Sequence, residues 1–537
     1  MDTSLHEVGH GAQSLGALLN KQARRYPDRV LFRFGGEEIT IREADLRSNR
    51  LANVLRHRGV EVGQRVGVML PNGFDFPLVW LALAKIGAVI VPINPAYEHA
   101  DLSFVVNDSG ARLALTTPDH IRKFTQIGQN CPELREITTL EPMEQTRPSG
   151  RSLFDDLQRA SAEPPTDLTE SIERTSLLNV QYTSGTTGFP KGCMLTHGYW
   201  LRIAEVSREA YGIRDDDVMM VAQPFFYMDA QWLTTTCLLA GVPLAILPRF
   251  SASTFWQSVK ENDVSVLYLL GTMPLLLMKQ PEHPALEKGH RLRLVYCSGI
   301  VPRLHSAFEA RWNVPWRETY GTTESGADLF VPIEDARSVG TGAMGKLVPD
   351  REARVVDEAG REVPDGEAGE LILRGNEMML GYWNQPEATA SKIRNGWLYT
   401  GDLVTRDAAG YYHMVGRLTD MVRRGGENIA AAEVEDVLCH HPGVRAAAVV
   451  AVPDELRGEE VKAFVQLQPG ESPQTVPPRL LIDFVKSNLA AFKAPRFIEY
   501  VDDFPRTPSE RIAKPVLLKQ KAAQRGGCYD DQLGSWT

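Results

Sequence analysis

The first hundred residues alternate between helix-periodic and short apolar segments. Residues 15–25 and 42–58 repeat apolar positions at the spacing of one helix face, whereas residues 65–70 and 88–92 favour strands. The most apolar stretch, residues 76–93, is interrupted by Lys85 and Gly87, so it predicts a buried helix followed by a strand rather than a membrane span. Alternation of this kind predicts an α/β fold with layered, largely parallel sheets.

Later segments extend this pattern and then change it. Residues 141–175 are rich in Pro, Ser, Thr and charge, which predicts a surface connection. Beyond residue 420, a helical pattern over residues 433–440 is followed by strand-like runs over 446–452 and 461–466, with a predicted turn at Pro453-Asp454 between them. This last part is expected to form a small α+β module.

Composition excludes several classes of protein. A length of 537 residues corresponds to about three or four domain-sized units. The formal net charge of −10 argues against a nucleic-acid partner, because phosphate binding needs basic patches. Six scattered cysteines without a C-x-x-C pair, and a polar first stretch without a visible signal peptide, predict reduced thiols in a cytoplasmic protein.

The most informative stretch is YTSGTTGFPKG, which ends an apolar run at Tyr182. Glycines let the backbone approach an anion, hydroxyls add hydrogen-bond donors, and Lys191 adds a positive charge suited to phosphate. The stretch differs from the nucleotide P-loop, because Pro190 precedes the lysine and Gly192 follows it. An ordinary Ser/Gly surface turn is the alternative. The predicted phosphate-binding residues are Thr183, Ser184, Gly185, Thr186, Thr187, Gly188 and Lys191.

This motif resembles the phosphate-binding signature of the adenylate-forming superfamily, which includes acyl- and aryl-CoA synthetases, peptide-synthetase adenylation domains and luciferases. Matching segments run from about residue 14 to residue 520. The resemblance implies a large N-terminal domain of layered α/β sheets, residues 1–419, which holds the AMP-binding site and the acyl pocket. It also implies a small mobile α+β domain, residues 420–537, that pivots at Asp420.

The resemblance assigns roles around the nucleotide. Ser298 and Gly299 would border the adenine. Residues 318–324 predict a strand that runs into a tight turn, where Tyr320 would give the adenine a flat face and Gly321 and Thr322 would also bind the nucleotide. Thr323 would donate to the α-phosphate and Glu324 would bind Mg²⁺, which takes one or two carboxylates together with phosphates. Residues 399–402 are expected to follow a strand, and Asp402 there would bind the ribose hydroxyls, although a turn-stabilising Asp is the alternative. Arg417 would reach the ribose or phosphate.

The remaining implied residues surround the acyl group and the thiol. Tyr227, Met228, Asp229 and Trp232 would form the acyl pocket, where relatives often carry a histidine at the position of Tyr227. The alternatives are that Tyr227 is a core aromatic residue and that Asp229 caps the following helix. Arg424, Gly425, Gly426 and Glu427 match the loop that approaches the active site during thioester formation with coenzyme A.

One segment departs from the family pattern. Where the family has P-R-T-x-S-G-K-I, residues 505–512 read PRTPSERI, so Glu510 replaces glycine and Arg511 replaces the catalytic lysine. Arginine keeps the charge but differs in size and geometry, and Glu510 adds a negative charge beside it. Lys514 fits the trailing basic position, which is ordinarily non-catalytic. The hypothesis is therefore an acid–thiol ligase that forms an acyl-CoA from an acyl-adenylate, with adenylation impaired or lost.

This hypothesis implies a carboxylic acid or its adenylate, coenzyme A, AMP or ATP, and Mg²⁺ if adenylation occurs. A separate adenylating enzyme would supply the acyl-adenylate, and a homodimer is compatible with the sequence. The alternatives are a complete ATP-dependent ligase, transfer to a carrier protein, a non-catalytic nucleotide-binding homologue, and a luciferase-type oxygenase that no feature supports. Arginines outnumber lysines, which suits a GC-rich bacterial genome and a specialised biosynthetic pathway. The acyl group is not identified.

Overall fold

The computed structural model describes residues 11–142, 151–183, 190–270, 272–424, 427–454, 457–506, 512–518 and 527–537. The chain forms two compact units. Unit 1 comprises the described residues of Met1–Glu352 and Arg374–Leu398, and unit 2 those of Ala353–Leu373 and Tyr399–Thr537. No helix among the described residues is long and apolar enough to cross a bilayer.

Unit 1 contains a mostly parallel sheet that ends in one antiparallel strand. Its order is β7 (Arg151–Ser152), β6 (Glu136–Thr139), β5 (Leu113–Thr116), β3 (Arg65–Met69), β4 (Val89–Pro92), β8 (Leu177–Thr183) and β9 (Lys191–Thr196). Strands β4 and β5 are buried at every position. This is typical of parallel strands, because both faces of such a sheet are covered.

A second row of strands in unit 1 carries the segments predicted to border the adenine. Its order is β16 (Ala343–Leu347), β15 (Gly326–Phe330), β14 (Trp316–Thr322), β13 (Leu294–Ser298), β12 (Val266–Leu270), β10 (Met219–Val221), β11 (Leu244–Ile246), β1 (Val30–Phe34) and β2 (Glu37–Thr40). Strands β10 to β14 pair in parallel, and β14 and β15 form an antiparallel hairpin.

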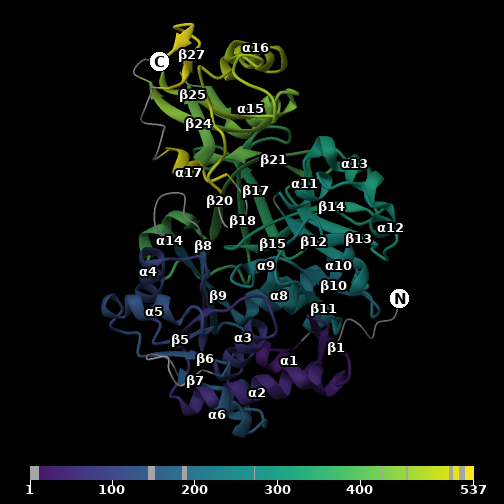
Figure 1. Ribbon diagram of the computed structural model, residues 1–537, viewed down its shortest axis with the longest axis vertical. Helices are drawn as coiled ribbons and strands as arrows, with labels where there is room; N and C mark the ends of the chain where they lie inside the picture. Colours follow the sequence, from purple (N-terminus) through teal and green to yellow (C-terminus); the bar gives the residue numbers. More distant parts are fainter. Residues whose placement is uncertain are drawn as a thin grey trace. The chain divides into compact units, whose positions relative to one another are not determined.

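Helices cover the sheets of unit 1, and α1, α2 and α3 contact one another (Figure 1). Helix α2 begins with a capping box between Thr40 and Glu43, whereas α3 is apolar almost all round and fully buried from Phe76 to Ile86. The helices are α1 (Leu15–Arg25), α2 (Ile41–His57), α3 (Asp75–Ile86), α4 (His99–Ser109), α5 (Ile121–Ile127), α6 (Phe154–Arg159), α7 (Thr166–Thr169), α8 (His197–Ala210), α9 (Met228–Ala240), α10 (Phe255–Glu261), α11 (Met273–Met278), α12 (Pro284–Glu287), α13 (Pro302–Trp312) and α14 (Pro386–Lys392).

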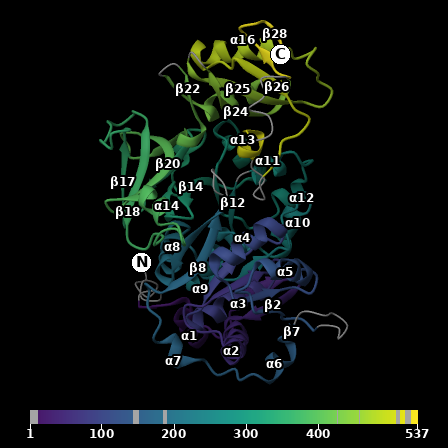
Figure 2. The ribbon, with the colours of Figure 1, turned by 90° about the vertical axis from the view of Figure 1, so that its left-hand side faces the viewer.

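Unit 2 has two groups of strands. The first is β17 (Arg351–Val356), β18 (Gly369–Gly375), β20 (Trp397–Arg406) and β21 (Tyr412–Arg417). The end residues Arg351–Glu352, Arg374–Gly375 and Trp397–Leu398 of these strands belong to unit 1, as does the short β19 (Ile393–Arg394), which pairs with β20. The second is β23 (Glu427–Ala430), β22 (Met421–Arg424), β25 (Gly458–Leu467), β26 (Phe497–Tyr500), β27 (Tyr529–Asp530) and β28 (Ser535–Trp536), with β24 (Val444–Asp454) also on β25. Helices α15 (Ala431–His440) and α16 (Pro478–Asn488) pack on this second group (Figure 2).

The predicted fold class is confirmed: a large N-terminal α/β part precedes a smaller α+β part. Three local predictions need correction. Residues 141–175 are more than a surface connection, because they contain β7, α6 and α7 and bury Leu153 and Ile172. Pro453 and Asp454 belong to β24 instead of forming a turn, because both pair with β25. Residues 399–402 lie inside β20 rather than after a strand. The domain boundary at residue 420 stays a prediction.

Candidate functional site

The strands on either side of the predicted phosphate loop are antiparallel neighbours in unit 1. Thr183, at the end of β8, lies opposite Lys191 at the start of β9. Gly192 is required here, because a Cβ atom would come within 2.6 Å of Val180. The predicted residues Ser184, Gly185, Thr186, Thr187 and Gly188 lie outside the described residues.

The turn between β14 and β15 carries Thr323 and Glu324. The hydroxyl of Tyr199, on α8, donates to the carbonyl oxygen of Thr323 (3.1 Å) and lies 4.0 Å from the sulfur of Met228 on α9. Burial raises the pKa of Tyr199 well above its usual value, so its hydroxyl remains a donor. Thr323, predicted to bind the phosphate, and Met228, predicted to line the acyl pocket, therefore both contact the buried side chain of Tyr199.

Glu324 and Lys191 meet at the ring of Tyr382. The hydroxyl of Tyr382 donates to Glu324 Oε1 (2.8 Å), and Lys191 Nζ lies 5.3 Å from the centre of the ring. The main chain of Glu324 is also fixed, because its carbonyl oxygen accepts from Met379 N (2.8 Å). The acid and the lysine that the sequence predicted for phosphate and metal thus belong to one cluster.

Glu318 organises the loop that is predicted to border the adenine. Its carboxylate accepts from the backbone N–H groups of Gly299 (2.6 Å) and Ile300 (2.7 Å). Burial raises its pKa to about 8, although both hydrogen bonds act in the opposite direction. Ser298 Oγ donates to Thr319 O (2.9 Å), which joins the end of β13 to β14.

Tyr320, Gly321 and Thr322 form the end of β14. The side chain of Tyr320 is buried, and Gly321 cannot be replaced, because a Cβ atom would lie 2.0 Å from the carbonyl oxygen of Gly326. Thr322 Oγ1 lies 2.8 Å from Ser325 Oγ, which closes the turn around Thr323 and Glu324. The hairpin therefore holds these residues in a defined backbone conformation.

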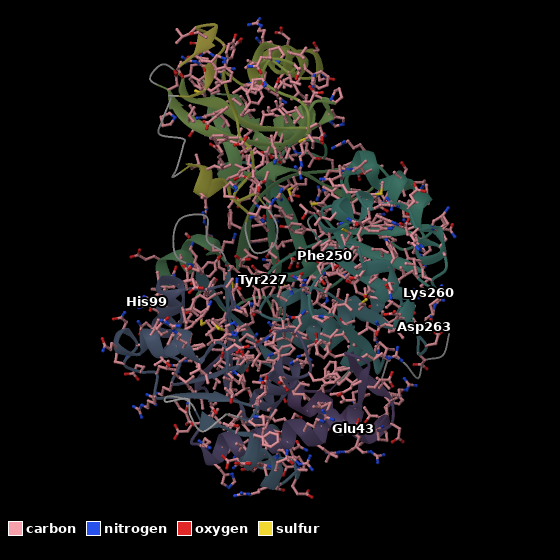
Figure 3. All side chains as sticks on the ribbon, viewed as in Figure 1. Glu43, His99, Tyr227, Phe250, Lys260 and Asp263 are labelled. Carbon is pink, nitrogen blue, oxygen red and sulfur yellow. The ribbon has the colours of Figure 1, made fainter. Side chains whose placement is uncertain are left out.

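The predicted acyl-pocket residues lie at the start of α9. Tyr227 occupies the N-cap position with extended backbone, and Figure 3 places it toward the middle of unit 1. The N-cap residue of α9 is Tyr227 and Asp229 lies in the first turn, which corrects the alternative that Asp229 is the cap residue. Trp232 is a core residue, since it is buried and its Nε1 donates to Ser207 Oγ (2.6 Å). Its contact with an acyl group stays a prediction.

Unit 2 brings together the two predicted ribose ligands. Asp402 on β20 lies opposite Arg417 on β21, and Arg417 Nε is 3.0 Å from Asp402 Oδ1. Gly401, with φ +78°, turns the backbone just before Asp402, and its N–H donates to Glu370 Oε1 (2.9 Å). The Asp402 side chain is buried whereas Arg417 is half-exposed, so the arginine can also reach a ligand.

The predicted thioester loop and the hinge also belong to unit 2. Arg424 ends β22, and its Nε lies 2.7 Å from the buried carboxylate of Glu460. Asp420 ends the short 3₁₀ turn Leu418–Asp420. Gly425, Gly426 and the side chain of Glu427 lie outside the described residues, as do Glu510 and Arg511.

Lys514 begins the short helix α17 (Lys514–Leu517) and is engaged with two carboxylates. Its Nζ lies 3.2 Å from Asp420 Oδ2 and 2.7 Å from Glu435 Oε1. The side chain is only 16 % exposed. The trailing lysine of the altered motif is thus part of the packing around the predicted hinge residue.

Among the described residues, no group of three or more His, Cys, Asp or Glu side chains could hold a metal ion by itself. The donor set at Glu324 suits Mg²⁺, which commonly takes one or two protein carboxylates and completes its shell with phosphate oxygens and water. Glu324 would hold such an ion only together with a bound nucleotide.

Two family models match the chain. Residues 19–383 match the model described as AMP-binding enzyme, and residues 433–511 match its C-terminal domain. The chain belongs to the AMP-binding enzyme family. The predicted membership of the adenylate-forming superfamily is therefore confirmed, and with it the enzyme class of acid–thiol ligases.

Relatives within this family match along almost the whole chain. A crotonobetaine/carnitine–CoA ligase of Salmonella paratyphi A is 32 % identical over 521 residues, which cover 94 % of this chain and 99 % of the relative. The ATP-bound structure of MatB from Rhodopseudomonas palustris is 29 % identical, with a TM-score of 0.85 over 94 % of this chain and 98 % of the other. An anthranilate CoA ligase in complex with anthranoyl-AMP shares the fold, with a TM-score of 0.85, 24 % identity, and coverage of 96 % and 98 %.

Sequence reasoning missed some residues of the candidate site. Glu318 precedes the Y-G-x-T-E segment by two positions, and its signal is an acidic residue on a strand whose neighbouring positions are buried. Tyr382 lies in the segment Gly381-Tyr382-Trp383, which resembles a family block of mainly structural character. Tyr199 gives no signal beyond an aromatic residue at the start of a helix, so only the three-dimensional contacts reveal it.

Proposed function

We propose that this AMP-binding enzyme forms an acyl-CoA thioester from an acyl-adenylate and coenzyme A, and that its ATP-dependent adenylation is slow or lost. The observation that carries this proposal is the pair Glu510 and Arg511, which replaces the glycine and lysine of the family motif. The residues predicted to bind the nucleotide keep the family pattern.

Charge and geometry explain why this pair matters for adenylation. In that half-reaction a carboxylate attacks the α-phosphorus of ATP, so two anions must approach each other. A positioned cation stabilises the developing charge, and losing one such contact lowers rates by about 10²–10³-fold in other enzymes. The planar guanidinium of Arg511 is not equivalent to an ammonium group, and Glu510 partly offsets its charge.

The surroundings of Lys514 support the same conclusion. A substitute lysine would need its ammonium group available for the reacting carboxylate and phosphate. Lys514 Nζ instead contacts Asp420 and Glu435, at 3.2 and 2.7 Å. Two carboxylates balance its charge and hold it in place, so in this arrangement it does not take over the role of the missing lysine.

Thioester formation makes different demands, because the leaving AMP is already attached to the acyl group. The thiol sulfur of coenzyme A attacks the acyl carbon, the carbon–oxygen bond to AMP breaks, and the thiol proton is released. In the family this step uses the glycine loop, and Gly425 and Gly426 are present. Coenzyme A is the proposed acceptor, and a carrier-protein pantetheine is the alternative.

A complete ATP-dependent ligase is the second candidate. The observation that favours it is the 32 % identity with a crotonobetaine/carnitine–CoA ligase over 94 % of the chain. Under this alternative Arg511 supplies enough positive charge for both half-reactions. The two candidates share the thioester product and differ only in whether the enzyme makes its own acyl-adenylate.

The names of the relatives suggest which acyl groups should be tested first. We propose carnitine, crotonobetaine and anthranilate as the first acids to test, because relatives and a structural neighbour carry these names. Asp229 beside the predicted acyl pocket would favour acyl groups that carry a positive charge or a hydrogen-bond donor.

The test supplies each acid as a synthetic acyl-adenylate, with coenzyme A or a phosphopantetheinyl carrier protein as the thiol. Formation of an acyl-CoA without ATP supports the proposal. Absence of a thioester with every adenylate and both thiols would overturn it in favour of a non-catalytic nucleotide-binding homologue. Product with the carrier protein alone would correct the acceptor.

A further inference from the structure

We propose that Tyr382 is a positioning residue for the phosphate end of the nucleotide site. Its hydroxyl holds one oxygen of the Glu324 carboxylate, which leaves the other oxygen for a divalent cation on the nucleotide, and its ring supports Lys191. This inference rests on nucleotide binding in the proposed function, and it holds whether or not adenylation is impaired.

The first support is the geometry at Glu324. The hydroxyl of Tyr382 is 2.8 Å from Oε1, and the main chain of Glu324 is fixed by the N–H of Met379 at 2.8 Å. A tyrosine hydroxyl donates one proton, so it can serve only one of the two carboxylate oxygens. The carboxylate is therefore held in one orientation with its second oxygen still able to bind a cation.

The second support is the chemistry of this contact, in which the phenol O–H of Tyr382 is the donor and the carboxylate of Glu324 is the acceptor. A hydrogen bond of this kind to a metal ligand orients it, and removing such a partner typically weakens metal binding by about 10- to 100-fold.

The third support is the rigid placement of Tyr382 beside β9. Its backbone N–H donates to Thr389 Oγ1 (2.8 Å), and the N–H of Trp383 donates to the carbonyl oxygen of Gly192 (2.7 Å). Gly381 has φ +139°, and a Cβ atom there would lie 2.5 Å from Thr389 Cγ2. Tyr382 thus forms an isolated antiparallel bridge with Cys193, two residues after Lys191.

The fourth support is the contact with Lys191 itself. Its ammonium nitrogen lies 5.3 Å from the centre of the Tyr382 ring, within the range of a cation–π interaction. One side chain thereby fixes both the cation and the acid that the sequence predicts for the phosphates.

The test uses Tyr382→Phe, which removes the hydroxyl and keeps the ring over Lys191. The readout is the Mg²⁺ concentration that gives half of the thermal stabilisation produced by saturating ATP, so it does not depend on turnover. We expect this concentration to rise about 10-fold.

Tyr182→Phe is the matched control. Tyr182 is equally buried, at 6 % exposure, and its hydroxyl donates to Asp108 Oδ2 (2.5 Å), a carboxylate outside the predicted site. Both variants lose a tyrosine–carboxylate hydrogen bond in unit 1. Only Tyr382→Phe should alter the Mg²⁺ dependence, whereas both should lower the unliganded melting temperature.

Further outcomes separate the inference from the function. In a Glu324→Gln background, Tyr382→Phe should have no additional effect on Mg²⁺ dependence, and an equal effect in both backgrounds would overturn the coupling. Equal Mg²⁺ responses of the Tyr382→Phe and Tyr182→Phe variants would also overturn it. If ATP gives the wild type no Mg²⁺-dependent stabilisation, this inference fails, while thioester formation is still judged by its own assay.

Discussion

Arg417 Nε lies 3.0 Å from Asp402 Oδ1, across a directly opposed pair of residues on β20 and β21. The two residues are 15 positions apart in the sequence, and both were predicted to reach the ribose of the nucleotide. The buried carboxylate is thus oriented by a half-exposed guanidinium. A carboxylate held this way can accept hydrogen bonds from two neighbouring hydroxyl groups.

Asp402→Asn should weaken AMP binding by about 10- to 100-fold, because an amide offers one acceptor where the carboxylate offers two and its charge is lost. Isothermal titration with AMP and with 2′,3′-dideoxy-AMP measures this. The control is Asp407→Asn, whose carboxylate accepts from the N–H groups of Ala409 and Tyr411 in the turn of the same hairpin. If Asp402→Asn still prefers AMP to the dideoxy analogue as strongly as the wild type, the ribose assignment is wrong.

Glu318→Gln should change how stability depends on pH. The pKa of Glu318 is about 8 in the folded protein and lies near its ordinary value of 4.5 in the unfolded chain. Between these values the folded state retains a proton that the unfolded state has lost, so this group makes stability fall as pH rises. Melting temperatures from pH 5 to 9 should therefore slope downward less in the variant. Identical slopes for both proteins would contradict the raised pKa of Glu318.

The same substitution should also weaken AMP binding, since glutamine has one acceptor for the two N–H groups of Gly299 and Ile300. The effect should be about 10-fold above pH 8, where Glu318 is ionised and the substitution removes one charge-assisted hydrogen bond. Glu309→Gln is the comparison, because Glu309 accepts from Trp316 N and Arg317 at the other end of β14. If Glu318→Gln binds AMP as tightly as the wild type, the loop that contains Gly299 and Ile300 is not part of the AMP-binding site.

His197 should limit stability in acid. Burial lowers its pKa to about 3, while its Nδ1 accepts from the N–H of Leu15 at 3.2 Å. The unfolded chain takes up a proton below about pH 6.5, so stability should be lost progressively as pH falls from 6.5 toward 3. Urea unfolding at pH 5 and pH 7 should show a smaller difference for His197→Asn than for the wild type. The exposed His440→Asn should keep the wild-type difference.

Lys514→Met should leave ATP–pyrophosphate exchange at the wild-type level, because Asp420 and Glu435 already hold the ammonium group. Some stability should be lost, since two carboxylates lose this partner, so unfolding is measured in parallel. Lys493→Met removes another lysine of unit 2 that pairs with a carboxylate, Glu433 at 2.7 Å, and serves as the comparison. If ATP–pyrophosphate exchange falls to background in Lys514→Met but not in Lys493→Met, Lys514 is the catalytic lysine.

Elements with a clear local signal were predicted well. The buried helix α3 and strand β4 follow from the apolar stretch, and the β14–β15 turn follows from the glycine and hydroxyl residues around Thr323. Local patterns fix such elements because periodicity and turn chemistry act over a few residues. The extension of β24 through Pro453 was missed, because a proline before an aspartate normally indicates a turn.

Contacts between distant segments could not be predicted in the same way. Tyr382 and Glu324 are 58 positions apart, and only the pairing of residues 380–383 with β9 brings them together. The role of Glu318 likewise depends on the loop after β13 turning back over β14. The hydrogen bond from the indole of Trp232 to Ser207 in the core could not be predicted from the sequence either, and the contact of Trp232 with an acyl group stays a prediction.

The most direct measurement is ATP–pyrophosphate exchange by the full-length wild type and by the double variant Glu510→Gly with Arg511→Lys, with the same panel of acids. We predict exchange at least about 100-fold faster in the double variant, and equal rates of thioester formation from synthetic acyl-adenylates in both proteins. Equal exchange by the two proteins would mean that Arg511 suffices, and that the wild type is a complete ATP-dependent ligase.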